Sequence, residues 1–223
     1  MFVLVILGLT VSVFGGRALW QQLAGRPTPA ELAQTARASM AARWSGLTAA
    51  QIFPATVGYL TPAGTRATAH RVGIAPWAPC AAAMNPLVAG ALRRHGCIAV
   101  LRATYADASG TLLVTAGLAI LPSVSAARAA MKASGANGSN AQVRPVAFPG
   151  TVAGLFGDTR RDIFAVEQTG PTFVLAAMGS ANGQYDPGAA VSPALLDLGT
   201  AIIRTLAGRV SGTGPCPGGA SRC

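Results

Sequence analysis

Apolar and polar positions alternate along much of residues 54–210, and this pattern predicts three β-hairpins separated by helices. The hairpins are expected at 56–74, 97–121 and 163–177, where Gly, Pro, Asp or Thr lie between two apolar runs. Helices are expected where apolar residues recur every three or four positions behind a capping residue: 86–95 after Asn85, a short helix reaching Ser134 after Ser123 or Ser125, and 193–207 after Ser192. A short edge strand is expected at 143–148.

This order of elements favours an α+β domain, in which an antiparallel sheet of β-hairpins carries helices packed on one face. Two parts of the chain share a loose order of an Arg-Arg pair, a hairpin and a helix. One begins at Arg93-Arg94 and the other at Arg160-Arg161. A ferredoxin-like duplication is therefore one interpretation of the fold.

The amino-terminal 16 residues contain no charge, and with Arg17 to Trp20 they form a 20-residue apolar segment. As a helix this segment is about 30 Å long, which matches the hydrocarbon core of a bilayer. A buried core helix and a signal peptide are the alternatives. No basic residue precedes the run, and Val13-Phe14-Gly15 is a poor cleavage site, so we expect one transmembrane anchor.

The expected organisation is a transmembrane anchor (1–20), a juxtamembrane helix (21–53), an α+β domain (54–210) and a Gly/Pro-rich tail (211–223). The juxtamembrane helix starts at a capping box formed by Thr28 and Glu31. Its apolar stripe consists of Leu32, Ala36, Met40 and Trp44. This stripe could pack on the domain, lie against the membrane, or pair with a protein partner or a second copy of the chain.

Four cysteines allow three disulfide pairings. A helix that begins after Asn85 leaves enough extended chain for Cys80 to run back along it and meet Cys97. Closing this loop would stabilise the fold by roughly 3 kcal/mol. The remaining pair, Cys216 and Cys223, could close a small loop in the tail.

The side of the membrane on which the body lies is contested within the sequence. Arg17, Arg26, Arg37 and Arg43 all follow the apolar run, which by the positive-inside rule favours a cytoplasmic body. An even number of cysteines behind an anchor instead favours disulfides and an oxidising compartment. We expect the body to be extracytoplasmic.

The chain carries 17 Lys and Arg residues against 7 acids, a net charge of +10. Its bases are scattered singly or in pairs, and aromatic residues make up only 6 %, so a nucleic-acid partner is disfavoured. A basic surface that faces anionic lipid head groups or an acidic wall polymer fits this charge better.

Catalytic motifs of the common hydrolases and phosphate-binding loops are missing from the sequence. No catalytic, metal-binding or cofactor-binding residue is predicted, and the cysteine spacings do not fit zinc. Asp158 and Asp162 are interpreted as a charged turn. Two alternatives stay open: an envelope-associated hydrolase with His70 or His95 as its base, and a protein that binds a small apolar ligand on the open face of the sheet.

The apolar anchor, the Arg-rich and Ala/Gly-rich body, and the cysteine-bearing helix followed by the stretch 97–107 together resemble a group of proteins. These are uncharacterised membrane-anchored extracytoplasmic proteins of high-GC actinobacteria, and the likeness lies in layout and composition. The resemblance implies a location and no reaction. The expected function is a non-enzymatic, membrane-anchored sensor or interaction domain.

Overall fold

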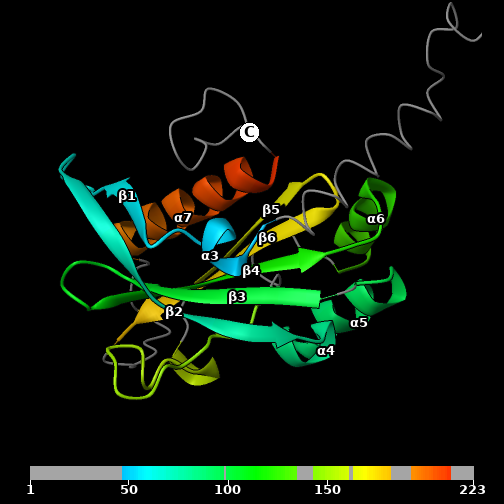
Figure 1. The fold of residues 1–223 in the computed structure, drawn as a ribbon, viewed down its shortest axis with the longest axis horizontal. Coiled ribbons are helices and arrows are strands. Elements are labelled where there is room, and N and C mark those ends of the chain that lie inside the picture. The colour runs from blue at the N-terminus through cyan, green and yellow to red at the C-terminus, as the bar shows by residue number, and fades with distance from the viewer. Residues whose placement is uncertain (1–46, 98, 135–142, 161–162, 182–191, 212–223) are drawn as a thin grey trace, which may run out of the picture. The chain divides into compact units, whose positions relative to one another are not determined.

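A computed structural model describes residues 47–97, 99–134, 143–160, 163–181 and 192–211 (Figure 1). All of these residues except Leu47 belong to one compact unit that begins at Thr48. The expected anchor (1–20), most of the juxtamembrane helix, and the tail from residue 212 lie outside the described residues. Among the helices that the structure does describe, none combines the length and the apolar character needed to cross a membrane.

The three predicted hairpins form a single six-stranded antiparallel sheet of order β1-β2-β3-β4-β6-β5 (Figure 1). The strands are β1 (Thr56–Leu60), β2 (Arg66–Ala78), β3 (Ala99–Ala106), β4 (Leu112–Ile120), β5 (Ile163–Thr169) and β6 (Thr172–Ser180). β2 passes through Pro76 because its register shifts between Ala75 and Ala78, a bulge that needs no ladder hydrogen bond from proline. β6, rather than β5, pairs with β4.

The last helix, α7 (Pro193–Ser211), fills the inside of a curled sheet. It contacts β4, β6 and both edge strands, β1 and β5. The short helix α3 (Ala49–Ile52) packs beside α7, and both its last residue, Ile52, and the following Phe53 are buried. A capping box formed by Thr48 and Gln51 starts α3 at Ala49, where one helix was expected to continue unbroken to residue 53.

Helices cover both faces of the sheet, which corrects the expectation that they pack on one face. Gly117 pairs with Leu175, and Leu175 packs in the cluster formed by α4 (Cys80–Ala83), α5 (Pro86–Arg94) and α6 (Val124–Ser134). Met178 is three residues further along β6 and therefore points to the opposite face. There it lies against Gly199 of α7.

The two units with a shared order of a hairpin and a helix are both present, as β3, β4 and α6 and as β5, β6 and α7. Their arrangement differs from a ferredoxin-like duplication with both helices on one face. The second unit differs, because α7 packs on the opposite face from α6. α4 and α5 join two strands, β2 and β3, that are antiparallel neighbours.

The segment at 143–148, expected as an edge strand, instead crosses the face of the sheet that α7 does not cover. Two paired threonines hold its backbone. The N–H of Val146 donates to Oγ1 of Thr115 (3.1 Å), Thr115 donates to Thr104 (2.8 Å), and Thr104 donates to the carbonyl of Val146 (2.8 Å). This closed cycle satisfies backbone groups that a β-ladder would otherwise pair.

Gly117 allows the crossing segment to approach the sheet. A Cβ atom at Gly117 would lie 2.7 Å from Cγ2 of Val143, and Val143 is fully buried and cannot move aside freely. We therefore expect Gly117→Ala to lower the free energy of unfolding by about 1–3 kcal/mol through overpacking. Gly58→Ala, in an open position of β1, is the matched control and should change it by less than about 0.5 kcal/mol. Equal effects of the two substitutions in urea unfolding would contradict the close contact.

Asp107 organises the turn between β3 and β4. Its carboxylate accepts hydrogen bonds from the backbone N–H of Leu112 (2.8 Å) and of Ser109 (3.2 Å), and from the Ser109 hydroxyl. Burial acts to raise the pKa of Asp107, but the hydrogen bonds from Ser109 and Leu112 outweigh it, and the pKa lies below its ordinary value.

A lowered pKa in the folded state means that the ionised Asp107 stabilises the fold above the pKa of the unfolded chain. This stabilisation is lost as the pH falls through the lowered value. Asp107→Asn should therefore reduce the free energy of unfolding by about 1–2 kcal/mol at pH 7 and by progressively less in acid. The control is Asp197→Asn on the exposed face of α7, which should change the free energy of unfolding little at either pH 7 or pH 2. If Asp107→Asn lowers the free energy of unfolding by the same amount from pH 7 to pH 2, the stabilising role of the charge is contradicted.

Candidate functional site

Helix α5 forms where the sequence predicts it, and its start and end have clear causes. The side chain of Asn85 accepts a hydrogen bond from the N–H of Val88 (2.9 Å), and Pro86 occupies the first helical position. At the other end the basic Arg93 and Arg94 lie in the last turn, where cations interact favourably with the helix dipole. The buried side of α5 packs on α4, α6 and the sheet.

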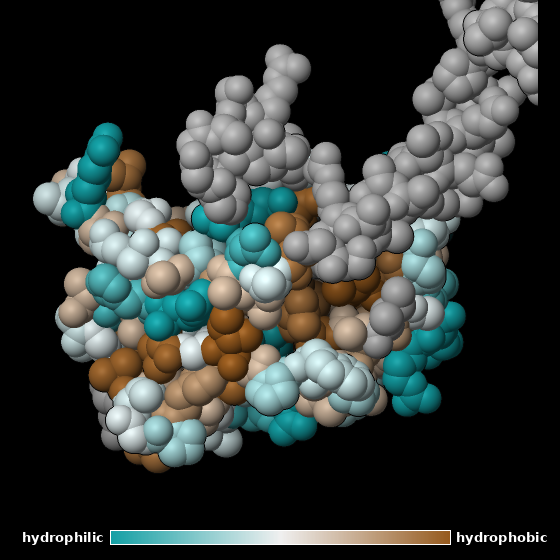
Figure 2. All heavy atoms as spheres, viewed as in Figure 1, coloured by the Kyte–Doolittle hydropathy of each residue, from teal (hydrophilic) through white to brown (hydrophobic). Residues whose placement is uncertain are grey.

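The outer side of α5 and its neighbour α6 form a cationic face. It consists of Arg93, Arg94, Arg128 and Lys132, all of them exposed. The sequence contains no acid at 48–106 or at 108–157, and none of the four cations has an ion-pair partner among the described residues. Figure 2 shows hydrophilic surface gathered on the side of the molecule where Figure 1 places these two helices.

An open depression lies on this face between the two arginines of α5. It has a volume of about 390 Å³, and its described lining consists of Gly90, Arg93 and Arg94. Gly90 contributes no side chain, so space remains between the guanidinium groups. Leu87, one turn earlier on the same side of the helix, is 62 % exposed. The cationic face thus also presents an apolar side chain.

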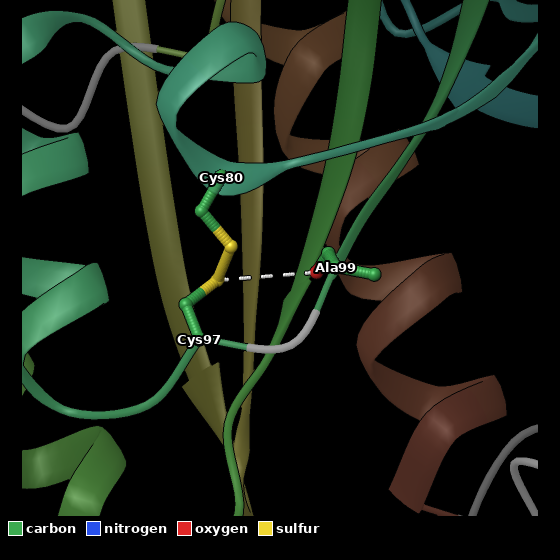
Figure 3. The surroundings of a disulfide bond; sticks show 3 residues. All are labelled: Cys80, Cys97 and Ala99. Atoms are coloured by element: carbon green, nitrogen blue, oxygen red, sulfur yellow. Dashed lines mark hydrogen bonds between the residues drawn. A yellow bond between two sulfur atoms is a disulfide. The ribbon is translucent and has the colours of Figure 1, made fainter.

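A disulfide joins the two ends of the unit that carries this face. Cys80 begins α4, Cys97 follows α5, and their Cα atoms are 6.3 Å apart (Figure 3). The predicted pairing of these two residues is therefore present in the structure. The other predicted pair, Cys216 and Cys223, lies outside the described residues.

The disulfide lies at the edge of the core between α5 and the sheet. Cys80 is buried and Cys97 is partly buried, in the cluster that includes Leu92 and Val100. Sγ of Cys97 lies 4.0 Å from the carbonyl oxygen of Ala99 (Figure 3). A sulfur in a disulfide has no proton to donate, so this is a van der Waals contact. In this oxidised form Cys97 has no thiol that the nearby His95 could activate.

A second group of cations lies on the α7 side of the sheet, where the arginines donate to backbone carbonyls of the same domain. Arg209 donates to the carbonyl of Gln51 (2.7 Å), Arg71 donates to the carbonyl of Phe53, and the Tyr105 hydroxyl donates to the carbonyl of Pro54 (3.1 Å). Burial raises the pKa of Tyr105, although Arg71 and Arg209 act to lower it. These contacts attach α3 to α7, and the residues directly after α3 to the sheet.

A third group contains the predicted charged turn. Arg144 forms an ion pair with Asp158 (2.7 Å), and its carbonyl accepts a hydrogen bond from Arg102 (3.2 Å). Burial, and then the charge of Arg144, lower the pKa of Arg102. Asp158 thus acts within a local charge network, while its predicted companion Asp162 lies outside the described residues.

The two histidines are not brought together. His70 pairs with Ala106 at one end of β3, whereas His95 precedes the other end. A strand of this length separates them by roughly 25 Å. Neither imidazole has a hydrogen-bonded acidic partner within the described ranges, and those ranges contain no group of three residues able to hold a metal ion.

Comparisons with protein-family models, with curated proteins and with solved structures found no match to this chain. The cationic face itself was only partly visible in the sequence. The net charge predicted a basic surface, and Arg93 and Arg94 were assigned to the end of a helix. That α6 adds Arg128 and Lys132 beside them follows from packing between distant segments.

Reduction of the disulfide between Cys80 and Cys97 should lower the free energy of unfolding by about 3 kcal/mol, because it restores the freedom of this loop in the unfolded chain. We expect the double variant Cys80→Ala, Cys97→Ala to show the same loss without reductant. The variant Cys216→Ala, Cys223→Ala is the matched control and should respond to reductant as the natural chain does. Denaturant unfolding with and without dithiothreitol measures all three proteins, and an unchanged midpoint in the first variant would contradict the prediction.

Proposed function

We propose that this chain is a single-pass, membrane-anchored, extracytoplasmic interaction domain that binds a partner through the cationic face of α5 and α6. The observation that carries the proposal is the disulfide between Cys80 and Cys97, which flanks α4 and α5 and so holds one of the two helices that present that face. The apolar segment 1–20 supports the membrane location. A disulfide in the body supports an oxidising compartment.

The arrangement suits binding because the face is both held in place and available. The disulfide ties α4 and α5 to the start of β3, and the apolar side of α5 is buried in the core. The opposite side exposes Arg93 and Arg94. Cations that have no ion-pair partner among the described residues are available to a ligand, and a fixed surface loses less conformational entropy when it binds.

The hydrolase alternative finds less support. It uses His70 or His95 as its base, and neither imidazole has a hydrogen-bonded acidic partner among the described residues. The small-ligand alternative assumed a sheet with one open face. α7 packs on one face and α5 and α6 pack on the other, so that premise is wrong.

A topology reporter tests the location. A phosphatase domain that is active only after forming its own disulfides, fused after Cys223, should be active in intact cells. A fluorescent protein that matures only in the cytoplasm, fused at the same position, should stay dark. Deletion of residues 1–20 is the control and should abolish the phosphatase signal. Phosphatase inactivity with bright cytoplasmic fluorescence would overturn the proposal, as would recovery of Cys80 and Cys97 as free thiols after trapping in cells.

A further inference from the structure

We infer that the partner of the cationic face is an anionic phospholipid surface, onto which α5 and α6 dock side by side. The inference rests on the proposed function, since an anchored domain has lipid head groups within reach. It names the ligand chemistry of that face: head-group phosphates for Arg93, Arg94, Arg128 and Lys132, and the acyl boundary for Leu87.

Charge complementarity is the first argument. Four exposed cations lie on two packed helices, and the sequence stretches around them contain no acid that could compete for them. Near an anionic membrane each Lys or Arg strengthens partition by about fivefold, and the effect extends over roughly one Debye length. Groups spread over two neighbouring helices therefore act together on a surface, whereas a single phosphate could contact only those nearest to it.

The distribution of apolar groups is the second argument. Leu87 lies on the same side of α5 as Gly90 and Arg94, and it is 62 % exposed. A leucine among cations is typical of a helix that lies in the head-group region with its apolar side chains directed at the acyl boundary. The open depression at Gly90 leaves room for a phosphate between Arg93 and Arg94. An acidic protein would account for the charges but not for Leu87.

Docking to a second membrane provides the test, because it separates this face from the anchor. The full-length chain is reconstituted in phosphatidylcholine nanodiscs and mixed with vesicles that contain 30 % phosphatidylglycerol. We expect the nanodiscs to float with these vesicles, to stay behind with pure phosphatidylcholine vesicles, and to be released by high salt. Arg93→Gln with Arg94→Gln should weaken the partition about 30-fold, and Leu87→Ser about fivefold.

A matched control removes the same number of charges elsewhere. Arg66 on β2 and Arg204 on α7 are exposed, and Arg66→Gln with Arg204→Gln should change the partition less than threefold. Conversion of Arg93 and Arg94 to lysine keeps the charge and should preserve binding. Circular dichroism and the thiol content verify the fold of each variant. Equal weakening by both pairs of glutamine substitutions would overturn the inference, because net charge alone would then explain the binding.

Two further outcomes are decisive. Binding to polyglutamate without binding to phosphatidylglycerol vesicles would overturn the lipid assignment in favour of an acidic polymer. Failure of the chain to enter phosphatidylcholine nanodiscs would count against the proposed anchor alone. In that case the chain kept in solution is mixed with the same vesicles, and the same variants test the cationic face.

Discussion

Burial of the central strands on both faces is the constraint on which the rest of this fold depends. Every residue of β4 between its two ends is buried, and β6 is buried along nearly its whole length. Antiparallel strands of this kind need a cover on each side, because exposed apolar area costs about 25 cal/mol per Å². Small residues make the covers fit: Gly117 lies under Val143, and Gly199 of α7 lies over Met178.

The cationic face follows from this constraint. α5 and α6 use their apolar sides to cover one face of the sheet, so their polar sides point outward. Cations occupy those sides, with no ion-pair partner in the part of the chain that the structure describes, and an exposed cation costs little by itself because water solvates it. The disulfide at the ends of α4 and α5 then limits how far this cover can move from the sheet. The packing of α5 and α6 on the sheet thus both stabilises the domain and exposes the cationic face.

Local signals predicted the parts of the structure that depend on neighbouring residues. The hairpins, α5 and the disulfide were predicted correctly, because each depends on residues close together in the sequence. The signals are Asp107 at a turn, Asn85 ahead of a proline, and the short chain between Cys80 and Cys97. The sequence also contains a signal that both faces of the sheet are covered, because β4 is an unbroken run of small and apolar residues without polar alternation.

The parts that were not predictable involve distant residues. Nothing near Val146 in the chain indicates that its backbone will bond to Thr104 and Thr115, more than 30 residues away. The same is true of the cationic face, which needs α5 and α6 to become neighbours. The α3 contacts with Arg71 and Arg209 again join segments that are far apart in the sequence.

The position of α7 has a consequence for the order of events during synthesis. This helix is the last described element of the chain, yet it packs against β1, the first strand. The concave side of the sheet therefore lacks this cover until α7 has been synthesised. Contacts between segments as far apart in the sequence as β1 and α7 are slow to form, because a long loop must close first. Closing the concave side of the sheet with α7 is therefore expected to be a late step in folding.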